Sequence, residues 1–415
     1  MRKIAWALLL VFAFAIPWEY SLDLGEPLGN AARIAGLLVL VAAVPALLQA
    51  GRLRAPGAAQ WVVLALYLWF CLTFFWTVEP EATFSRMRGL FQEMMLVWLV
   101  WEFAESPEDL RSMMRCYVAG AWVLALLTLA NLGSVEATAA EQIRFVAQGQ
   151  DPNDVARYLD LGLPLAALLL QCERRWPQRL LAMSYLPVGL LAVLLTASRG
   201  GFLAGLIALA GCAWLLCRGQ PRFALAAAAT LPVLAATAWF SVPYATIERL
   251  ATIPEQLQGG DLNQRWAIWS AGWRAFERAP VLGSGAGSFV SAAGMNPLDT
   301  AHNTELSILV GGGLIALTLA AVIVALAARS ALTTRGPLRL ALATVLLVLL
   351  VAAQVDTVEE NRVTWLLLGI VALAGRLACE QPQRLAACFA AWSASPERAV
   401  GQPASVAGLR SNPAG

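Results

Sequence analysis

The stretch TELSILVGGGLIALTLAAVIVALA, residues 304–327, decides the fold class of this chain, and Glu305 is its only charged residue. About 20 apolar residues are enough for a helix to cross the hydrocarbon core of a bilayer. The segment must be helical there, because lipid offers no partner for open backbone N–H and C=O groups. Residues 304–327 therefore predict a membrane-spanning helix.

Composition extends this prediction to the whole chain. Of its 415 residues, 59% are hydrophobic and 13% are charged, whereas soluble domains carry roughly 25% charged residues. We therefore expect an all-α integral membrane protein with about twelve transmembrane helices. The apolar runs that predict them are residues 4–18, 34–49, 59–76, 89–101, 113–132, 158–170, 180–196, 201–217, 223–241, 304–327, 338–355 and 363–378.

The distribution of charge predicts the orientation in the membrane. The net charge is only +2, which gives no electrostatic reason to expect nucleic acid as a partner. When Arg2 and Lys3 are placed inside and the spans alternate, most basic residues fall in inside segments and most acidic ones outside. Cytoplasmic segments are enriched in Lys and Arg. Both termini are therefore predicted to be cytoplasmic, with residues 242–303 on the outer side.

These patterns divide the chain into three parts. Residues 1–380 are predicted to form one polytopic membrane domain, and residues 242–303 an outer loop within it that carries an amphipathic helix. Residues 381–415 are rich in Ala, Pro, Gly and Ser and are predicted to be a disordered cytoplasmic tail. The seven cysteines fall in spans or inside segments, which argues against a disulfide framework.

The loop helix is predicted from Asn263 to about Arg278. One stripe of this helix is aromatic and typical of an anchor at the membrane interface; it consists of Trp266, Trp269, Trp273 and Phe276. Arg265 borders this apolar, membrane-facing side, whereas Arg274 and Arg278 lie away from it. A cation is costly in that place unless it meets an anion, so we expect Arg265 to bind phosphate through its planar guanidinium fork.

Arg199 and His302 are further candidates at the outer face. Arg199 lies in the turn TASRGG, residues 196–201, whose glycines allow close approach of a ligand; a snorkelling anchor is the alternative. His302 is the only histidine, and an unperturbed imidazole titrates near neutrality, as a general base requires. Glu305, one turn further on, is placed to orient the ring. An interfacial histidine without a role is the alternative.

Two motifs have simpler interpretations. GSGAG, residues 283–287, lacks the βαβ unit of a dinucleotide-binding loop and is predicted to be a turn. In DPND, residues 151–154, Asp151 and Asp154 offer two carboxylates for a metal. Asp151 as N-cap and Pro152 as first helical residue explain the motif more simply, so no metal is expected.

Several of these motifs together resemble the O-antigen ligase/polymerase superfamily of bacterial envelope enzymes. They are the run NQRWAIWSAGWRAFERAPVLGSGAGSF followed by AHNTELSILVGGGLIAL, and the earlier DPNDVARYLDLGLPLA and TASRGGFLAG. The resemblance covers residues 145–320. It implies a GT-C-like glycosyltransferase of the bacterial inner membrane with a periplasmic active site. It also implies an undecaprenyl-pyrophosphate-linked glycan as donor and a sugar hydroxyl of lipid A-core as acceptor.

The resemblance further implies roles for individual residues. Arg199 and Arg265 would clamp the pyrophosphate, and His302 would activate the acceptor hydroxyl, without a cofactor. Many relatives carry an acid shortly before the glycines; here Val310 stands in that place, which moves such a role to Glu305. The other residues expected to bind substrate are Arg144, Asn153, Arg157 and Asn303.

The function predicted first is therefore an O-antigen ligase. A repeat-unit polymerase and a protein O-oligosaccharyltransferase share its chemistry and are the alternatives within the superfamily. A lipid or glycan transporter without chemistry is the alternative from another class. Transporters carry ionisable residues near the membrane midplane, and the scarcity of such residues in the predicted spans disfavours that class.

Overall fold

The computed structural model describes residues 1–22, 25, 29–133, 144–217, 242–260, 264–296 and 300–390. In these residues the regular structure is helical, with no β-strand. The predicted span 223–241 and residues 391–415 of the predicted tail lie outside the described residues.

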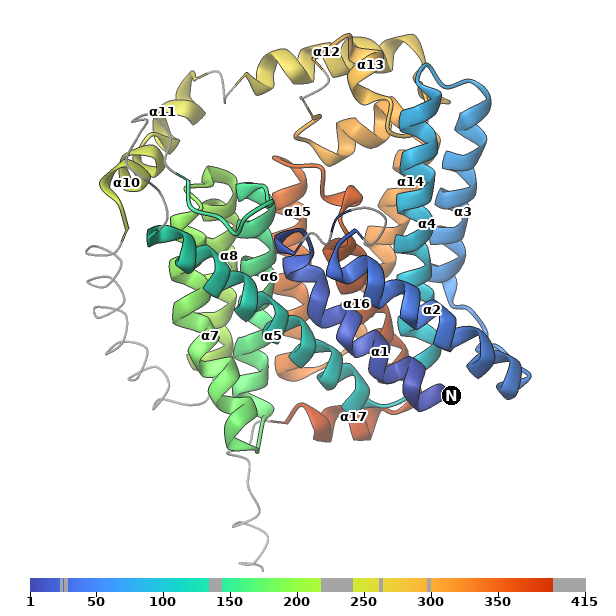
Figure 1. The fold of residues 1–415 in the computed structure, drawn as a ribbon, viewed down its shortest axis with the longest axis vertical. Helices are drawn as coiled ribbons and strands as arrows, with labels where there is room; N and C mark the ends of the chain where they lie inside the picture. Colours follow the sequence, from blue (N-terminus) through green and yellow to red (C-terminus); the bar gives the residue numbers. More distant parts are fainter. Residues whose placement is uncertain are drawn as a thin grey trace, which may run out of the picture.

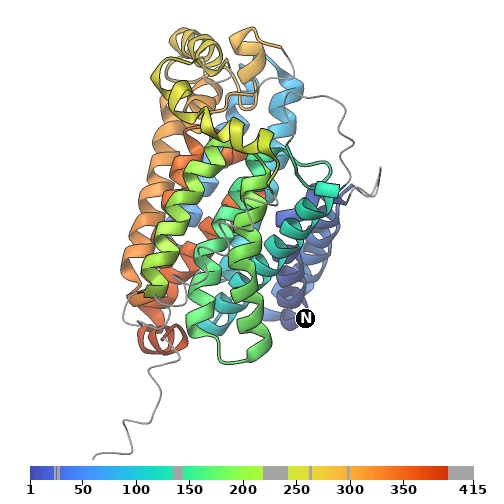
Figure 2. The same cartoon turned by 90° about the vertical axis from the view of Figure 1, so that its left-hand side faces the viewer.

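The long helices stand side by side in one bundle (Figures 1 and 2). They are α1 (Arg2–Ala15), α2 (Ala31–Ala50), α3 (Ala58–Leu72), α4 (Pro80–Phe103), α5 (Pro107–Ala130), α6 (Pro152–Cys172), α7 (Trp176–Leu195), α8 (Arg199–Cys217), α14 (Thr304–Thr333), α15 (Gly336–Ala353) and α16 (Arg362–Glu380). Short 3-10 turns connect or extend them: η1 (Ile16–Ser21), η2 (Thr73–Phe75), η3 (Asn131–Gly133) and η4 (Val358–Glu360).

Ten helices of the described part are long and apolar enough to cross a membrane, so the chain is an all-α, multi-pass membrane protein. These ten correspond to ten of the twelve predicted spans. The predicted span 89–101 lies within α4, whose other half carries Glu81, Arg86 and Arg88. This polar half keeps α4 out of the set of ten.

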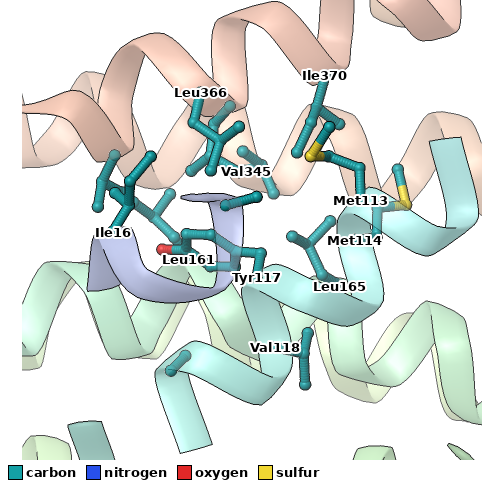
Figure 3. Close-up of a cluster of buried hydrophobic side chains, with 14 of the residues drawn as sticks. Ile16, Met113, Met114, Tyr117, Val118, Leu161, Leu165, Val345, Leu366 and Ile370 are labelled. Carbon is teal, nitrogen blue, oxygen red and sulfur yellow. The ribbon is translucent and has the colours of Figure 1, made fainter. Parts of the chain in front are cut away.

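The centre of the bundle is formed by α6 and α16. The spanning segment of α6 is buried throughout and is surrounded by α5, α7, α8 and α15. Side chains from η1, α5, α6, α15 and α16 interdigitate there (Figure 3). They include Ile16, Met113, Met114, Tyr117, Val118, Leu161, Leu165, Val345, Leu366 and Ile370. Burial of these residues fixes the axial position of α6, whose first turn carries candidate site residues.

Four short helices lie across one end of the bundle, which we call the α12 end (Figure 1). They are α10 (Tyr244–Ala251), α11 (Ile253–Gln258), α12 (Arg265–Arg278) and α13 (Phe289–Ala293). Met1 and α17 (Pro382–Cys388) lie at the opposite end. The loop helix expected up to Arg278 is α12, and its buried residues Ile268, Gly272 and Ala275 pack against α13 and α14.

The C-terminal boundary differs from the expectation of a disordered tail after residue 380. Helix α17 continues the chain, and it packs against α5 and α16. Leu385, Cys388 and Phe389 are buried, and Arg111 donates a hydrogen bond of 3.2 Å to the Cys388 carbonyl. These three buried side chains hold α17 against the bundle, although the average composition of residues 381–415 is typical of a disordered tail.

Candidate active site

Distant segments of the sequence meet at the α12 end and bring four arginines together. Hydrogen bonds join residues 144–151 to the turn after α7, that turn to α10, and the start of α14 to the loop between α15 and α16. We call the four arginines the arginine cluster: Arg144, Arg199, Arg249 and Arg265. Arg144 interacts electrostatically with each of the other three.

Arg144 is held by the turn and by the first turn of α6. Its Nε donates to the Thr196 carbonyl at 3.3 Å, and a terminal nitrogen donates to Asn153 Oδ1 at 3.2 Å. Burial, followed by the positive charges of the other cluster members, lowers the pKa of Arg144 to about 10. A lowered pKa means that the charged form is destabilised at this place, and a bound anion would relieve that penalty.

Arg199 and Arg249 brace each other through the backbone. Arg199 Nε donates to the Arg249 carbonyl at 3.3 Å, and Arg249 Nε donates to the Ala197 carbonyl at 3.1 Å. Ala197 is fully buried, with a φ of 50°, so the turn before α8 is tight, and its contact with Arg249 places it against α10. Burial and then the charge of Arg199 lower the pKa of Arg249.

Arg265 is the first residue of α12 and lies on the face of that helix that turns toward the protein. The prediction that separated it from the exposed Arg274 and Arg278 is confirmed, but the prediction of a membrane-facing side is wrong. Trp269, on the same face, donates to the Ala301 carbonyl at 3.2 Å. The helical period identifies residues that share a face. It does not show whether that face contacts lipid or protein, and here the face contacts α13 and α14.

The predicted aromatic stripe of α12 is divided between two environments. Trp269 and Phe276 pack partly against the cluster of apolar residues below α12, whereas Trp266 and Trp273 are 59% and 52% exposed. Edge-on ring contacts join Trp266 to Trp269, with ring centroids 5.8 Å apart. Only the two exposed rings are therefore placed to act as an interfacial anchor.

Little negative charge opposes the arginine cluster. Burial lowers the pKa of Arg265, while the charges of Asp356 and Asp151 act in the opposite direction. No residue of the described part donates to, accepts from or forms an ion pair with the Arg265 side chain, and Arg144 and Arg249 form no ion pair there. A half-buried group of guanidinium charges of this kind suits an anionic ligand.

The nearby aspartates have other partners. Asp151 accepts from the backbone N–H groups of Asn153 at 2.7 Å and Asp154 at 3.4 Å, which makes it the N-cap of α6 as the sequence indicated. Asp154 and Asp356 both pair with Arg157, whose side chain is 2% exposed. These contacts occupy the two carboxylates of the DPND motif that the metal alternative required.

Arg157 and Asn153, which the sequence predicts to bind substrate, both have partners within the protein. Arg157 lies beneath the site as an ion-pair partner, with its guanidinium 5.3 Å from the ring centroid of Tyr158. Asn153 Oδ1 accepts from Arg144 and, at 2.7 Å, from Ser198 Oγ, so it links α6 to the turn that carries Arg199. Both residues hold other parts of the site in place.

The start of α14 carries the histidine. His302 has a φ of 45°, and its Nδ1 lies 3.2 Å from Thr300 Oγ1. Asn303 caps α14 by accepting from the Leu306 N–H at 2.8 Å, and its amide nitrogen donates to the Gln354 carbonyl at 3.3 Å. Asn303 thus serves the helix start, which is a simpler role than the substrate contact expected of it.

The loop from Gln354 to Asn361 lies against the start of α14; the sequence indicated an outer loop here but singled out none of its residues. Gln354 Nε2 donates to Glu305 Oε1 at 2.7 Å, so Glu305 faces this loop. Thr304 Oγ1 donates to the Asp356 carbonyl at 2.8 Å. Because Ala301 contacts α12 and Thr304 contacts this loop, His302 lies between α12 and the loop. Neither Asp356 nor Arg249 belongs to a motif that the sequence analysis recognised. The available signal for Asp356 was its position as an acidic residue directly after the predicted span 338–355.

The glycine motifs form a clamp on α14. Helix α14 is broken at Gly313, with a φ of 66° and a ψ of −166°. The N–H of Ser284 donates to the Val310 carbonyl at 2.7 Å, and the N–H of Gly285 donates to the Gly311 carbonyl at 3.0 Å. GSGAG is thus the turn that was predicted, and it also satisfies the carbonyls freed by the break.

Comparison with known proteins gives one family for part of the chain. Residues 184–321 match the family described as O-antigen ligase. The match runs from α7 into α14, so it includes Arg199, Arg249, Arg265, His302 and the glycine clamp. Comparison with curated proteins gave no match.

Proposed function

With residues 184–321 belonging to the O-antigen ligase family, we propose that this chain is an O-antigen ligase of the bacterial inner membrane. It would move an O-antigen glycan from undecaprenyl pyrophosphate to a sugar hydroxyl of lipid A-core. The termini would be cytoplasmic and the α12 end periplasmic. The observation that carries the proposal is the arginine cluster, which offers a diphosphate several guanidinium groups at one end of an apolar bundle.

The donor's diphosphate would bind at the arginine cluster. Arg265 and Arg199 approach from α12 and from the start of α8, and Arg144 and Arg249 lie beside them. Hydrogen bonds to charged groups contribute roughly 1.5–3 kcal/mol each. Because negative charge on the leaving diphosphate grows in the transition state, the cluster stabilises that state more than the bound donor. The apolar surfaces of the spans would hold the polyprenyl tail.

The transfer itself needs one base and no redox partner. The acceptor hydroxyl oxygen forms a bond to the anomeric carbon while the bond from that carbon to the phosphate oxygen breaks. The bonding electron pair leaves with undecaprenyl pyrophosphate, and the hydroxyl proton passes to the imidazole of His302. Attack from the side opposite the leaving group inverts the anomeric configuration. General-base catalysis of this kind contributes roughly 10²–10⁴-fold.

Metal ions are not required by this proposal, because the guanidinium groups neutralise the diphosphate. We expect transfer to persist in the presence of EDTA. Loss of transfer in EDTA and its recovery with Mg²⁺ or Mn²⁺ would contradict this part of the mechanism.

The full-length protein in lipid nanodiscs provides the test. It would be supplied with a purified undecaprenyl-pyrophosphate-linked O-antigen and with lipid A-core, and release of undecaprenyl pyrophosphate would be measured together with the glycolipid product. We expect release that depends on the acceptor, and loss of most of it in His302→Ala. Elongation of the donor glycan instead of the acceptor would identify a polymerase. Absence of acceptor-dependent release would refute the proposed function.

A further inference from the structure

A polar pocket lies between η1, α4 and the junction of η4 with α16. Its volume is about 380 Å³, within the range of roughly 300–1,000 Å³ typical of small-ligand sites. Its lining includes Tyr20, Ser85, Arg86, Glu360 and Arg362. None of these residues has a role in the transfer step described above.

The pocket has no net positive charge to offer an anion. Arg86 pairs with Glu93 at 3.2 Å, and Arg362 pairs with the buried Glu19. Glu360 is exposed and forms no hydrogen bond or ion pair through its carboxylate in the described residues. The lining therefore combines neutralised guanidinium donors with an unused carboxylate acceptor. A diphosphate would be repelled by Glu360, in contrast to its attraction to the arginine cluster.

Such a lining matches a neutral polyhydroxylated ligand. Each sugar hydroxyl both donates and accepts a hydrogen bond, so it needs donors and acceptors side by side. The guanidinium N–H groups of Arg86 and Arg362 supply donors, and Glu360 supplies an acceptor. Tyr20 is 42% exposed and adds a ring face for the apolar C–H groups of a sugar. We propose that this pocket binds a neutral sugar of the acceptor, an inference that rests on the proposed function.

The pocket shares a loop with Asp356, whose charge acts on Arg265 of the arginine cluster. Glu360 at the pocket and Asp356 at the site belong to the same loop, four residues apart. Four residues span at most about 14 Å even when extended, and η4 shortens that distance. Arg86 donates to the Glu359 carbonyl at 2.7 Å and ties the pocket wall to this loop. A short acceptor oligosaccharide held in the pocket can therefore present a hydroxyl near the cluster.

Gly89 of α4 allows the pocket to be filled without disturbing the backbone. A Cβ at this position would meet only Arg86 Nη1, at 3.6 Å, and the flexible side chain can move. Leucine also favours the helix more than glycine does. Gly89→Leu would thus occupy space that the acceptor sugar needs. Arg88→Leu places the same side chain on the exposed neighbouring position of α4, outside the pocket, and is the matched control.

The experiment is a kinetic comparison of full-length variants in nanodiscs. Core oligosaccharide released from lipopolysaccharide serves as the acceptor probe, and the KM values for donor and acceptor are measured separately. We expect Gly89→Leu to raise the acceptor KM by about tenfold, the factor that corresponds to one lost hydrogen bond. The donor KM should stay unchanged, and Arg88→Leu should behave as wild type.

Two outcomes would overturn the pocket assignment: an unchanged acceptor KM in Gly89→Leu, or an equal rise in the donor KM. If Gly89→Leu does not fold, Glu360→Ala at the exposed loop position removes the hydrogen-bond acceptor and gives the same test. We expect a severalfold higher acceptor KM, and an unchanged acceptor KM would contradict the assignment. Failure of the proposed function is distinct, because the wild type would then show no acceptor-dependent release of undecaprenyl pyrophosphate.

Discussion

Replacement of Gly313 by alanine should disconnect the histidine-bearing half of α14 from its clamp. The φ of 66° and ψ of −166° at Gly313 lie in a region that is essentially restricted to glycine, and such strain costs about 1–3 kcal/mol. In addition, a Cβ would lie 2.1 Å from the Val281 carbonyl oxygen. The 279–285 segment must therefore move away from α14.

The magnitude follows from the bonds that this movement breaks. The N–H of Leu314 donates to the Pro280 carbonyl at 2.9 Å, next to the two bonds from Ser284 and Gly285. Loss of two of these bonds costs about 1–3 kcal/mol at roughly 0.5–1.5 kcal/mol each. Together with the strain, Gly313→Ala should destabilise the protein by about 2–6 kcal/mol.

Thermal unfolding of the purified protein, followed by tryptophan fluorescence, measures this effect. Gly51→Ala is the control: Gly51 also has a positive φ, 62°, but a Cβ there meets nothing within 4 Å. Alanine in that left-handed conformation costs roughly 1–2 kcal/mol. Gly313→Ala should therefore have the clearly lower Tm. Equal Tm values for the two variants would refute the idea that the clamp holds α14.

Three further expectations concern the loop, the helix cap and the cluster. Burial, and next the negative charge of Glu360, raise the pKa of Glu359 to about 8. The stabilising contribution of the protonated Glu359 is therefore complete below the pKa of the unfolded state and is lost as the pH rises toward 8. Glu359→Gln should flatten the decline of Tm between about pH 5 and 8, and an unchanged decline would contradict this expectation. Asn303→Ala should destabilise the protein by about 1 kcal/mol through loss of the cap, and Asn303→Asp should restore most of it, as Tm values will show. Arg249→Ala and Arg199→Ala should both weaken donor binding, because the two arginines brace each other; wild-type affinity of Arg249→Ala in a filter-binding assay would argue against that role.

Hydropathy was sufficient to predict the ten helices that are long and apolar enough to span a membrane, because backbone groups in lipid leave few alternatives. The start of α6 was also predictable, since Asp151 and Pro152 act within one turn of it. The face of α12 that contacts the protein was not predictable from the sequence. Periodicity placed Arg265 relative to Trp269, but whether that face met lipid or protein depended on α13 and α14.

Long-range partners explain most of the remaining differences. Arg157 was expected to contact substrate, yet its partner Asp356 lies about two hundred positions away in the sequence, and no local pattern joins them. The role of GSGAG likewise depends on a break in α14 that only tertiary contacts define. Local motifs therefore indicated the candidate residues, and non-local ion pairs and hydrogen bonds show which of them have partners within the protein.

The proposed function depends above all on binding of the donor's diphosphate at the arginine cluster. Binding of undecaprenyl pyrophosphate to the full-length protein tests it most directly, with Arg265→Ala compared with Arg274→Ala on the same helix. Arg265 faces the cluster, whereas Arg274 is exposed. We expect the affinity of Arg265→Ala to be about tenfold or more lower, which corresponds to the loss of one charge-assisted hydrogen bond, and the affinity of Arg274→Ala to equal that of the wild type. Equal affinities of the two variants would contradict it.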